Sequence, residues 1–279
     1  MVTGAAGQLG TDVVKRFEAE GGHEVVAVDL VDFDITQRDA VVGAVRHAKP
    51  DVILHGAAYT AVDKCETEIE TAYNVNVMSV RHFAEAARDT GAHLLYVSTD
   101  YVFDGTKDSP YHEWDTPNPQ SVYGQTKLAG ERELGPDATI MRTSWVCGEY
   151  GNNIVKTILR LLDGEDDLQF VDDQRGHPSF CADLAKMMFT LATEKRPGTF
   201  HVTNQGAVSW YEFTQEVAKA AGHDPARVHP ITTADMPLPA PRPANSVLEN
   251  RALALSGIEL LPDFRGPLND LVGKLTSSG

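Results

Sequence analysis

The chain has 279 residues, of which 42% are apolar and 23% charged, as in a globular protein with room for one large domain and a smaller second region. Its formal charge of −16 opposes attraction to the phosphates of nucleic acids or of anionic lipids, so neither is expected as a partner. The three cysteines are not clustered, and no apolar run approaches the roughly 20 residues that span a bilayer. We therefore expect a cytoplasmic protein without a disulfide framework, a zinc site or a membrane-spanning helix.

Short β-branched runs alternate with amphipathic stretches over the first two thirds of the chain. Strands are expected at residues 1–3, 24–29, 51–54, 93–98 and 139–143, and helices at residues 9–20, 38–48, 70–90, 123–133 and 152–162. Such alternation is typical of successive βαβ units, and strands that are apolar on both faces belong in a parallel sheet covered by helices on each side. The pattern predicts an α/β fold with a Rossmann-like doubly wound parallel sheet.

The alternation loosens after about residue 150. A further strand is expected near residues 198–204, returning to the main sheet, and helices are expected at residues 182–192 and 211–221. The proline-rich run at 236–243 cannot be helix interior, because proline lacks the amide donor, so it should be an extended loop over the surface or over a cleft. We therefore divide the chain into a domain at 1–150 and a smaller C-terminal region at 151–279.

Three glycines at a spacing of three, Gly4, Gly7 and Gly10, follow the first strand and open the first helix. Glycine lets the backbone turn tightly and approach a pyrophosphate, whose charge is held by the helix N-terminal amides. Asp29 ends the second strand, where a carboxylate can bind the adenosine ribose and repel a 2′-phosphate, which favours NADH over NADPH. The alternatives are a glycine-rich turn without a ligand and a solvated aspartate.

Tyr123 and Lys127 are four residues apart in a predicted helix, so both side chains lie on one face. The ammonium can then lower the pKa of the phenol. The strand before this helix leads into Ser98, Thr99 and Asp100, which offers the Thr99 hydroxyl at the carboxyl edge of the sheet where ligands bind. Beside a nicotinamide this set predicts carbonyl reduction: Tyr123 gives the proton, Thr99 orients the carbonyl, and Lys127 holds the ribose and the phenolate. The pair of Tyr and Lys alone could also arise by chance.

Other catalytic motifs are missing from the sequence. There is no HExxH, no paired CxxC and no clustered set of histidines, so no catalytic metal is predicted. GxSxG is also missing, which argues against an α/β-hydrolase nucleophile.

Several stretches together carry a resemblance to a known family. They are VTGAAGQLG at 2–10, YVSTDYVFDG at 96–105, VYGQTKLAGE at 122–131, DDQRGHPS at 172–179 and RPANSVL at 242–248. The chain resembles the extended short-chain dehydrogenases/reductases and, among them, the dTDP-4-dehydrorhamnose reductases, over nearly its whole length. It departs from them at His55, where Asn is usual, and in having only three residues before Gly4, so we expect a short first strand.

The resemblance implies NAD(P)H-dependent reduction of the C4 ketone of dTDP-4-dehydrorhamnose (dTDP-4-dehydro-6-deoxy-L-mannose) to dTDP-L-rhamnose. The alternatives are reduction of another dTDP-4-keto-6-deoxyhexose in a secondary-metabolite pathway, and a non-catalytic nucleotide-binding regulatory subunit. It implies NADH or NADPH as cofactor, admits a Mg²⁺ ion whose ligands we do not place, and admits a homodimer. Residues 1–150 would bind the dinucleotide, and residues 151–279 would mainly bind the nucleotide sugar.

The resemblance also assigns site residues. The catalytic set is Thr99, Tyr123 and Lys127. Residues for the cofactor are Gly4, Gly7, Gln8, Leu9, Gly10, Asp29, Asp34, Ile35, Ala58, Tyr59, Thr60, Tyr123 and Lys127, and residues for the substrate are Thr99, Asp100, Trp145 and Arg242. Arg242 would bind the pyrophosphate of the nucleotide sugar, because guanidinium pairs with phosphate oxygens. Each has a simpler alternative: Trp145 as a core aromatic, Ala58 and Ile35 as packing residues, Asp34 at a helix entry, Asp100 as a turn cap and Arg242 as a solvated side chain.

Overall fold

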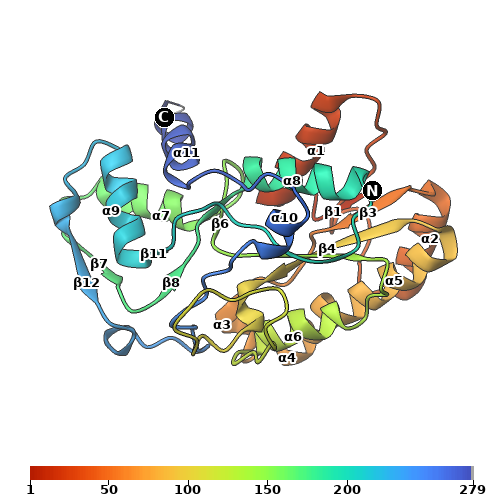
Figure 1. Ribbon diagram of the computed structural model, residues 1–279, viewed down its shortest axis with the longest axis horizontal. Helices are drawn as coiled ribbons and strands as arrows, with labels where there is room; N and C mark the ends of the chain where they lie inside the picture. Colours follow the sequence, from red (N-terminus) through yellow and green to blue (C-terminus); the bar gives the residue numbers. More distant parts are fainter. Residues whose placement is uncertain (278–279) are drawn as a thin grey trace.

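The computed structural model describes residues 1–277 and has a main sheet of six parallel strands. Their spatial order is β10–β5–β4–β3–β1–β2 (Figure 1). The strands are β1 (Val2–Thr3), β2 (Ala27–Val28), β3 (Val52–His55), β4 (His93–Thr99), β5 (Thr139–Thr143) and β10 (Gly198–His201). The chain runs from β1 to β2 on one side and then crosses to β3 on the other, which confirms the doubly wound sheet and places a switch point beside β1.

Helices cover both faces of this sheet (Figure 1). On one face α1 (Gln8–Glu20) packs against α8 (Cys181–Thr193), and the other is covered by α2 (Arg38–Ala48), α5 (Ser79–Thr90) and α6 (Val122–Glu131). Buried apolar clusters lie on each side, one containing Val13 and Leu184 and the other Val45 and Phe83. Within residues 1–277, no helix has the length and apolarity that crossing a membrane requires.

Two predicted elements differ from those observed. The strand expected at 24–29 is reduced to β2, because this edge strand pairs only with the two residues of β1. The helix expected at 70–90 is divided into α4 (Ile69–Tyr73), a π-helical turn η1 (Asn74–Met78) and α5. A π-turn widens the helix and often marks a functional position; here it carries the buried Asn76.

The C-terminal region has an apolar core of its own. Helices α7 (Ile154–Leu162), α9 (Trp210–Ala220) and α11 (Arg265–Ser277) surround Ile158, Phe213 and Phe264.

The strand expected near 198–204 is β10, which lies beside β5, and the proline-rich run at 236–243 forms neither helix nor strand. The remaining elements are α3 (Val62–Cys65), η2 (Asp100–Val102), η3 (Pro225–Arg227), η4 (Thr233–Asp235), α10 (Arg251–Leu255) and the strand pairs β6 (Val146–Cys147) with β9 (Ser179–Phe180), β7 (Leu168–Val171) with β12 (Val228–Ile231), and β8 (Arg175–Gly176) with β11 (Val208–Ser209).

Candidate active site

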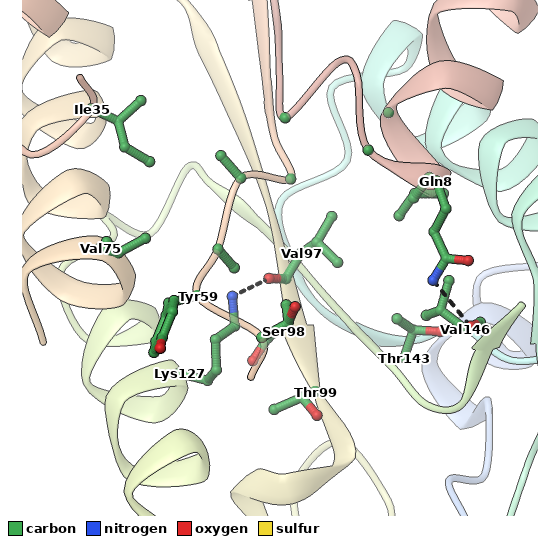
Figure 2. Close-up of a pocket in the computed structure, with 18 of the residues that line it drawn as sticks. Gln8, Ile35, Tyr59, Val75, Val97, Ser98, Thr99, Lys127, Thr143 and Val146 are labelled. Atoms are coloured by element: carbon green, nitrogen blue, oxygen red, sulfur yellow. Dashed lines mark hydrogen bonds between the residues drawn. The ribbon is translucent and has the colours of Figure 1, made fainter. Parts of the chain in front are cut away.

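A cleft of about 760 Å³ opens at the carboxyl ends of the main strands. Side chains from α1, the segment after β3, the end of β4 and helix α6 line it (Figure 2). Among the predicted site residues only Arg242 is not part of its lining; the others are Gly4, Gly7, Gln8, Leu9, Gly10, Asp29, Asp34, Ile35, Ala58, Tyr59, Thr60, Thr99, Asp100, Tyr123, Lys127 and Trp145.

The glycine loop between β1 and α1 forms the floor of one end of the cleft. Gly4 has a φ of +69°, a conformation that L side chains rarely adopt. A Cβ on Gly10 would lie 2.0 Å from the carbonyl oxygen of Gly4, so no larger residue fits there. The amides at the start of α1 lie at this end of the cleft, which makes the loop suited to an anionic ligand such as a pyrophosphate.

The cleft is lined by two carboxylates, Asp29 and Asp34, of which Asp29 lies beside the glycine loop. Asp29 Oδ2 accepts a hydrogen bond from Ala6 N at 2.8 Å, which holds the carboxylate beside the glycine loop. Hydrogen bonds from the backbone and hydroxyl of Thr36 lower the pKa of Asp34. Lys127 is the single Lys or Arg among the described residues that line the cleft. A ligand group with additional negative charge therefore meets no cation at the end where Asp29 lies.

Gln8 connects the glycine loop to the segment that leads into the C-terminal region. Its Nε2 donates to the carbonyl oxygen of Val146 at 3.1 Å (Figure 2), and its Oε1 accepts from Asn153 Nδ2 at 3.3 Å. Asn153 also caps α7, since its Oδ1 accepts from Lys156 N. The side chain of Gln8 thus joins the two regions.

The predicted catalytic residues lie together because α6 packs closely on the end of β4. A Cβ on Gly124 would lie 2.2 Å from the carbonyl oxygen of Tyr101, so glycine permits this approach. The Thr99 hydroxyl donates to Asp100 Oδ1 at 2.9 Å. Burial raises the pKa of Tyr123, and the hydrogen bond with Thr99 opposes the rise only in part. Tyr123 is thus a protonated phenol at neutral pH.

Lys127 is buried, and its Nζ donates to the carbonyl oxygen of Val97 at 2.7 Å (Figure 2). The ammonium also lies 4.1 Å from the ring centroid of Tyr96. Burial lowers the pKa of Lys127 to about 7, against the opposing effect of Glu131. The expected lowering of the Tyr123 pKa by Lys127 is not seen in this structure: burial raises the pKa more than the hydrogen bond with Thr99 lowers it, and Lys127 is not among the groups that shift it.

Asp100 and Trp145 line the part of the cleft next to Thr99. Burial raises the pKa of Asp100 to about 6, and its Oδ2 has no hydrogen-bond partner among the described residues. Trp145 has a φ of +46° and stacks on Trp210, with ring centroids 3.5 Å apart and an interplanar angle of 7°. Strained backbone of this kind is common at binding sites. Trp145 is both a core aromatic and part of the cleft wall.

Arg242 lies outside the cleft, in the proline-rich segment. Its Nη2 donates to Asp63 Oδ2 at 2.9 Å and its Nη1 to the carbonyl oxygen of Ala240 at 3.1 Å. Its charge acts on Tyr101, which does line the cleft, by opposing the rise that burial causes in the pKa of that phenol. The structure thus joins Arg242 to α3 rather than to the other predicted residues.

Asn76 is the main residue that sequence reasoning missed. Its Oδ1 accepts from Tyr59 N at 2.8 Å, and its Nδ2 donates to Tyr59 O and to Thr126 Oγ1, each at 3.1 Å. It therefore connects the segment after β3 to α6. Its role could not be predicted, because residues 70–90 have the pattern of one regular helix and nothing in the sequence marks the π-turn.

Hydroxyls at the end of β5 were missed as well. Thr143 and Ser144 line the cleft. They could have been predicted from the sequence, because they lie at the carboxyl end of a predicted parallel strand. Among the described residues, no group of three or more His, Cys, Asp or Glu side chains is arranged to hold a metal ion.

Comparisons with known proteins agree on one family. The model of the RmlD substrate binding domain matches residues 1–277. A dTDP-4-dehydrorhamnose reductase of Aggregatibacter actinomycetemcomitans is 44% identical over 263 residues, covering 89% of this chain and 90% of the relative. The crystal structure of a dTDP-4-dehydrorhamnose reductase from Clostridium acetobutylicum superposes with a TM-score of 0.95 at 41% identity, covering 99% of this chain and 98% of that one. A Bacillus anthracis dTDP-4-dehydrorhamnose reductase, solved in complex with NADP, has a TM-score of 0.92 at 36% identity, covering 100% and 98%.

Proposed function

The chain belongs to the RmlD substrate binding domain family, and from this premise we propose that it reduces the C4 ketone of dTDP-4-dehydrorhamnose to give dTDP-L-rhamnose, with a nicotinamide cofactor. The observation that carries the proposal is the meeting of Thr99, Tyr123 and Lys127 in one cleft with the glycine loop. Since a purely regulatory nucleotide-binding subunit has no need of this set, the set argues against that alternative.

The residues of the cleft fit a reduced nicotinamide dinucleotide. The glycine loop would hold the pyrophosphate, Asp29 the adenosine ribose and Lys127 the nicotinamide ribose. When bound, the cofactor supplies the hydride that is added to C4 of the sugar.

The side chains of the chain supply the proton and the orientation. Tyr123, whose pKa burial raises, holds a proton at neutral pH and donates it from its phenol oxygen to the carbonyl oxygen as the C=O bond is reduced. The Thr99 hydroxyl lies beside Tyr123 and can turn from Asp100 to the same oxygen. Lys127 lies on the same face of α6, and its ammonium would stabilise the phenolate that forms on Tyr123 once the proton is transferred. Trp145 and Asp100 would contact the sugar.

The carboxylate of Asp29 supports a preference for NADH over NADPH. An NADPH 2′-phosphate would lie near Asp29, with no Lys or Arg lining that end of the cleft among the described residues. We expect both cofactors to bind, with a KM for NADPH about tenfold higher than that for NADH. An Asp29→Ala variant should reduce this ratio, and a ratio that stays unchanged would contradict the role of Asp29.

Location and assembly stay predictions. The three cysteines are buried and free, which agrees with a reducing cytoplasm. The homodimer and the Mg²⁺ ion that the resemblance admits are not tested by a single chain.

The decisive assay measures oxidation of NADH by the purified chain with dTDP-4-dehydrorhamnose, and compares the product with authentic dTDP-L-rhamnose. The control substrate is dTDP-4-keto-6-deoxyglucose, which differs in configuration. Turnover restricted to a different 4-keto sugar would support the secondary-metabolite alternative. Binding of both ligands without oxidation of NADH would support a regulatory subunit.

A further inference from the structure

A buried ion pair lies one helical turn beyond Lys127 on α6. Glu131 follows Lys127 by four residues, as Lys127 follows Tyr123, so the three side chains share one face of the helix. Glu131 binds Arg142 in bidentate fashion: Oε1 accepts from Nε at 2.9 Å and Oε2 from Nη2 at 2.6 Å. Both side chains are only 5% exposed.

The ion pair is joined to the strand end that carries the reaction. Ser98 Oγ donates to Glu131 Oε1 at 2.5 Å. Ser98 lies between Val97, whose carbonyl oxygen accepts from Lys127, and Thr99 (Figure 2). Arg142 lies opposite Ser98 in the register of β4 and β5. The network thus holds α6, β4 and β5 together at the positions from which Lys127 and Thr99 reach the cleft.

Besides Glu131, the titratable groups around Lys127 are His55, Tyr96 and Tyr123. Burial lowers the pKa of His55 on β3 to about 3, which leaves this imidazole neutral. Burial also raises the pKa of Tyr96 on β4 and of Tyr123 on α6, so both phenols keep their protons. Glu131 is the carboxylate that opposes the desolvation of Lys127, and the cation of Arg142 lies on its far side in β5.

A contribution to the stability of the fold does not by itself explain the buried Glu131–Arg142 pair. Replacing a buried ion pair by apolar side chains of similar volume is often neutral or stabilising, because desolvation of two charges offsets their attraction. This pair is hydrogen-bonded through Ser98 to the end of β4, next to the carbonyl of Val97 that Lys127 binds, so a role in the site would account for it.

We propose that Glu131 is a positioning residue for the reduction: paired with Arg142, it keeps Lys127 in its charged form in the cleft and holds the end of β4 that presents Thr99. This inference rests on the proposed function of the cleft. It concerns a residue that touches neither substrate nor cofactor, since Glu131 does not line the cleft.

The test is the pH profile of the Glu131→Gln variant. With a pKa of about 7, Lys127 is charged below that pH and loses its charge as the pH rises through it. The kcat/KM should therefore fall on the alkaline side. Removing the Glu131 carboxylate should lower the pKa of Lys127, so the alkaline fall in kcat/KM should move to lower pH by about one unit. At a pH above this fall, kcat/KM should be about tenfold lower than in the wild type. At a lower pH the loss should be smaller.

Glu133→Gln is the matched control. Glu133 lies just beyond the same helix and binds Arg81 in bidentate fashion at 2.7 and 2.8 Å, but on the surface. Its variant should keep the wild-type profile. If the Glu133 variant shifts the limb as far as Glu131→Gln does, or Glu131→Gln turns over with an unshifted limb, the proposal is overturned.

Glu131→Gln leaves Arg142 buried without its partner, which can prevent folding. If the single variant does not fold, the same pH profile is measured on the double variant Glu131→Gln/Arg142→Met, which removes both charges. Its alkaline limb should still lie below that of the wild type, and a limb restored to the wild-type position would show that the Glu131 charge is not needed.

The pH dependence of NADH binding, followed by cofactor fluorescence, separates this inference from the proposed function. If the wild type oxidises no NADH with any 4-keto sugar, the proposed reduction fails. The Glu131 variant should even so lose NADH affinity at lower pH than the wild type, because Lys127 would hold the ribose. Equal profiles for the two proteins would reject the role of Glu131.

Discussion

The regions 1–150 and 151–279 contribute to the cleft in different ways. Every described residue that lines the cleft lies between positions 4 and 146. Residues 151–279 contact the residues that line the cleft: Trp210 stacks on Trp145, and Asn153 binds Gln8. Residues 151–279 thus support the wall of this cleft without lining it, and their binding of the nucleotide sugar stays a prediction. The lining of the cleft and the support for that lining come from different parts of the chain.

The physical basis of this division is the sheet. Parallel strands bring their carboxyl ends to one edge, and the segments that follow β1, β3, β4 and β5 all meet there. The C-terminal region instead completes a separate apolar core around α7, α9 and α11. Variants in the two regions should therefore affect different kinetic constants.

The largest effect is expected in the first region. Tyr123→Phe removes the phenol that donates the proton while keeping the ring, so kcat should fall by about 10³-fold or more. The Kd for NADH should change little, since a ring of the same shape still fills this part of the cleft. Retention of a tenth or more of the wild-type kcat would show that another group supplies the proton.

Arg242→Ala tests whether the second region also touches the ligand. If Arg242 leaves Asp63 to bind the substrate pyrophosphate, the KM for the nucleotide sugar should rise by about 10 to 30-fold, with little change in the KM for NADH. Asp63→Asn is the control, because it releases Arg242 from its present partner. An equal rise in KM for both variants would mean that Arg242 only holds the proline-rich segment against α3.

A smaller effect is expected from Trp210→Ala. Loss of the stacked ring leaves Trp145 without support on one face, so the KM for the nucleotide sugar should rise by roughly three to tenfold. The Kd for NADH should stay the same, and near-ultraviolet circular dichroism should lose the signal of the stacked pair. Trp114→Ala, at a ring that is 61% exposed and outside the cleft lining, should change neither constant. If the KM also stays constant in Trp210→Ala, Trp145 needs no support from the C-terminal region.

Local patterns in the sequence were sufficient for the fold class and for most of the site. Gly4, Gly7 and Gly10 are readable because only glycine tolerates that loop, and Tyr123 and Lys127 because helical spacing places them on one face. Thr99 is readable from its place at a strand end. The same reasoning did not find Asn76, whose role depends on a π-turn inside an apparently regular helix.

By itself, then, the sequence determined most elements of the main sheet, its parallel order and most of the chemical groups at its carboxyl edge, because periodicity and turn chemistry are local properties. The tertiary structure decided the protonation of those groups and the partners of distant side chains. Burial, which no local pattern measures, raises the pKa of Tyr123 and lowers that of Lys127. Packing between segments distant in sequence decides which side chains meet. Arg242 pairs with Asp63, Trp145 stacks on Trp210, and Glu131 binds Arg142 and Ser98.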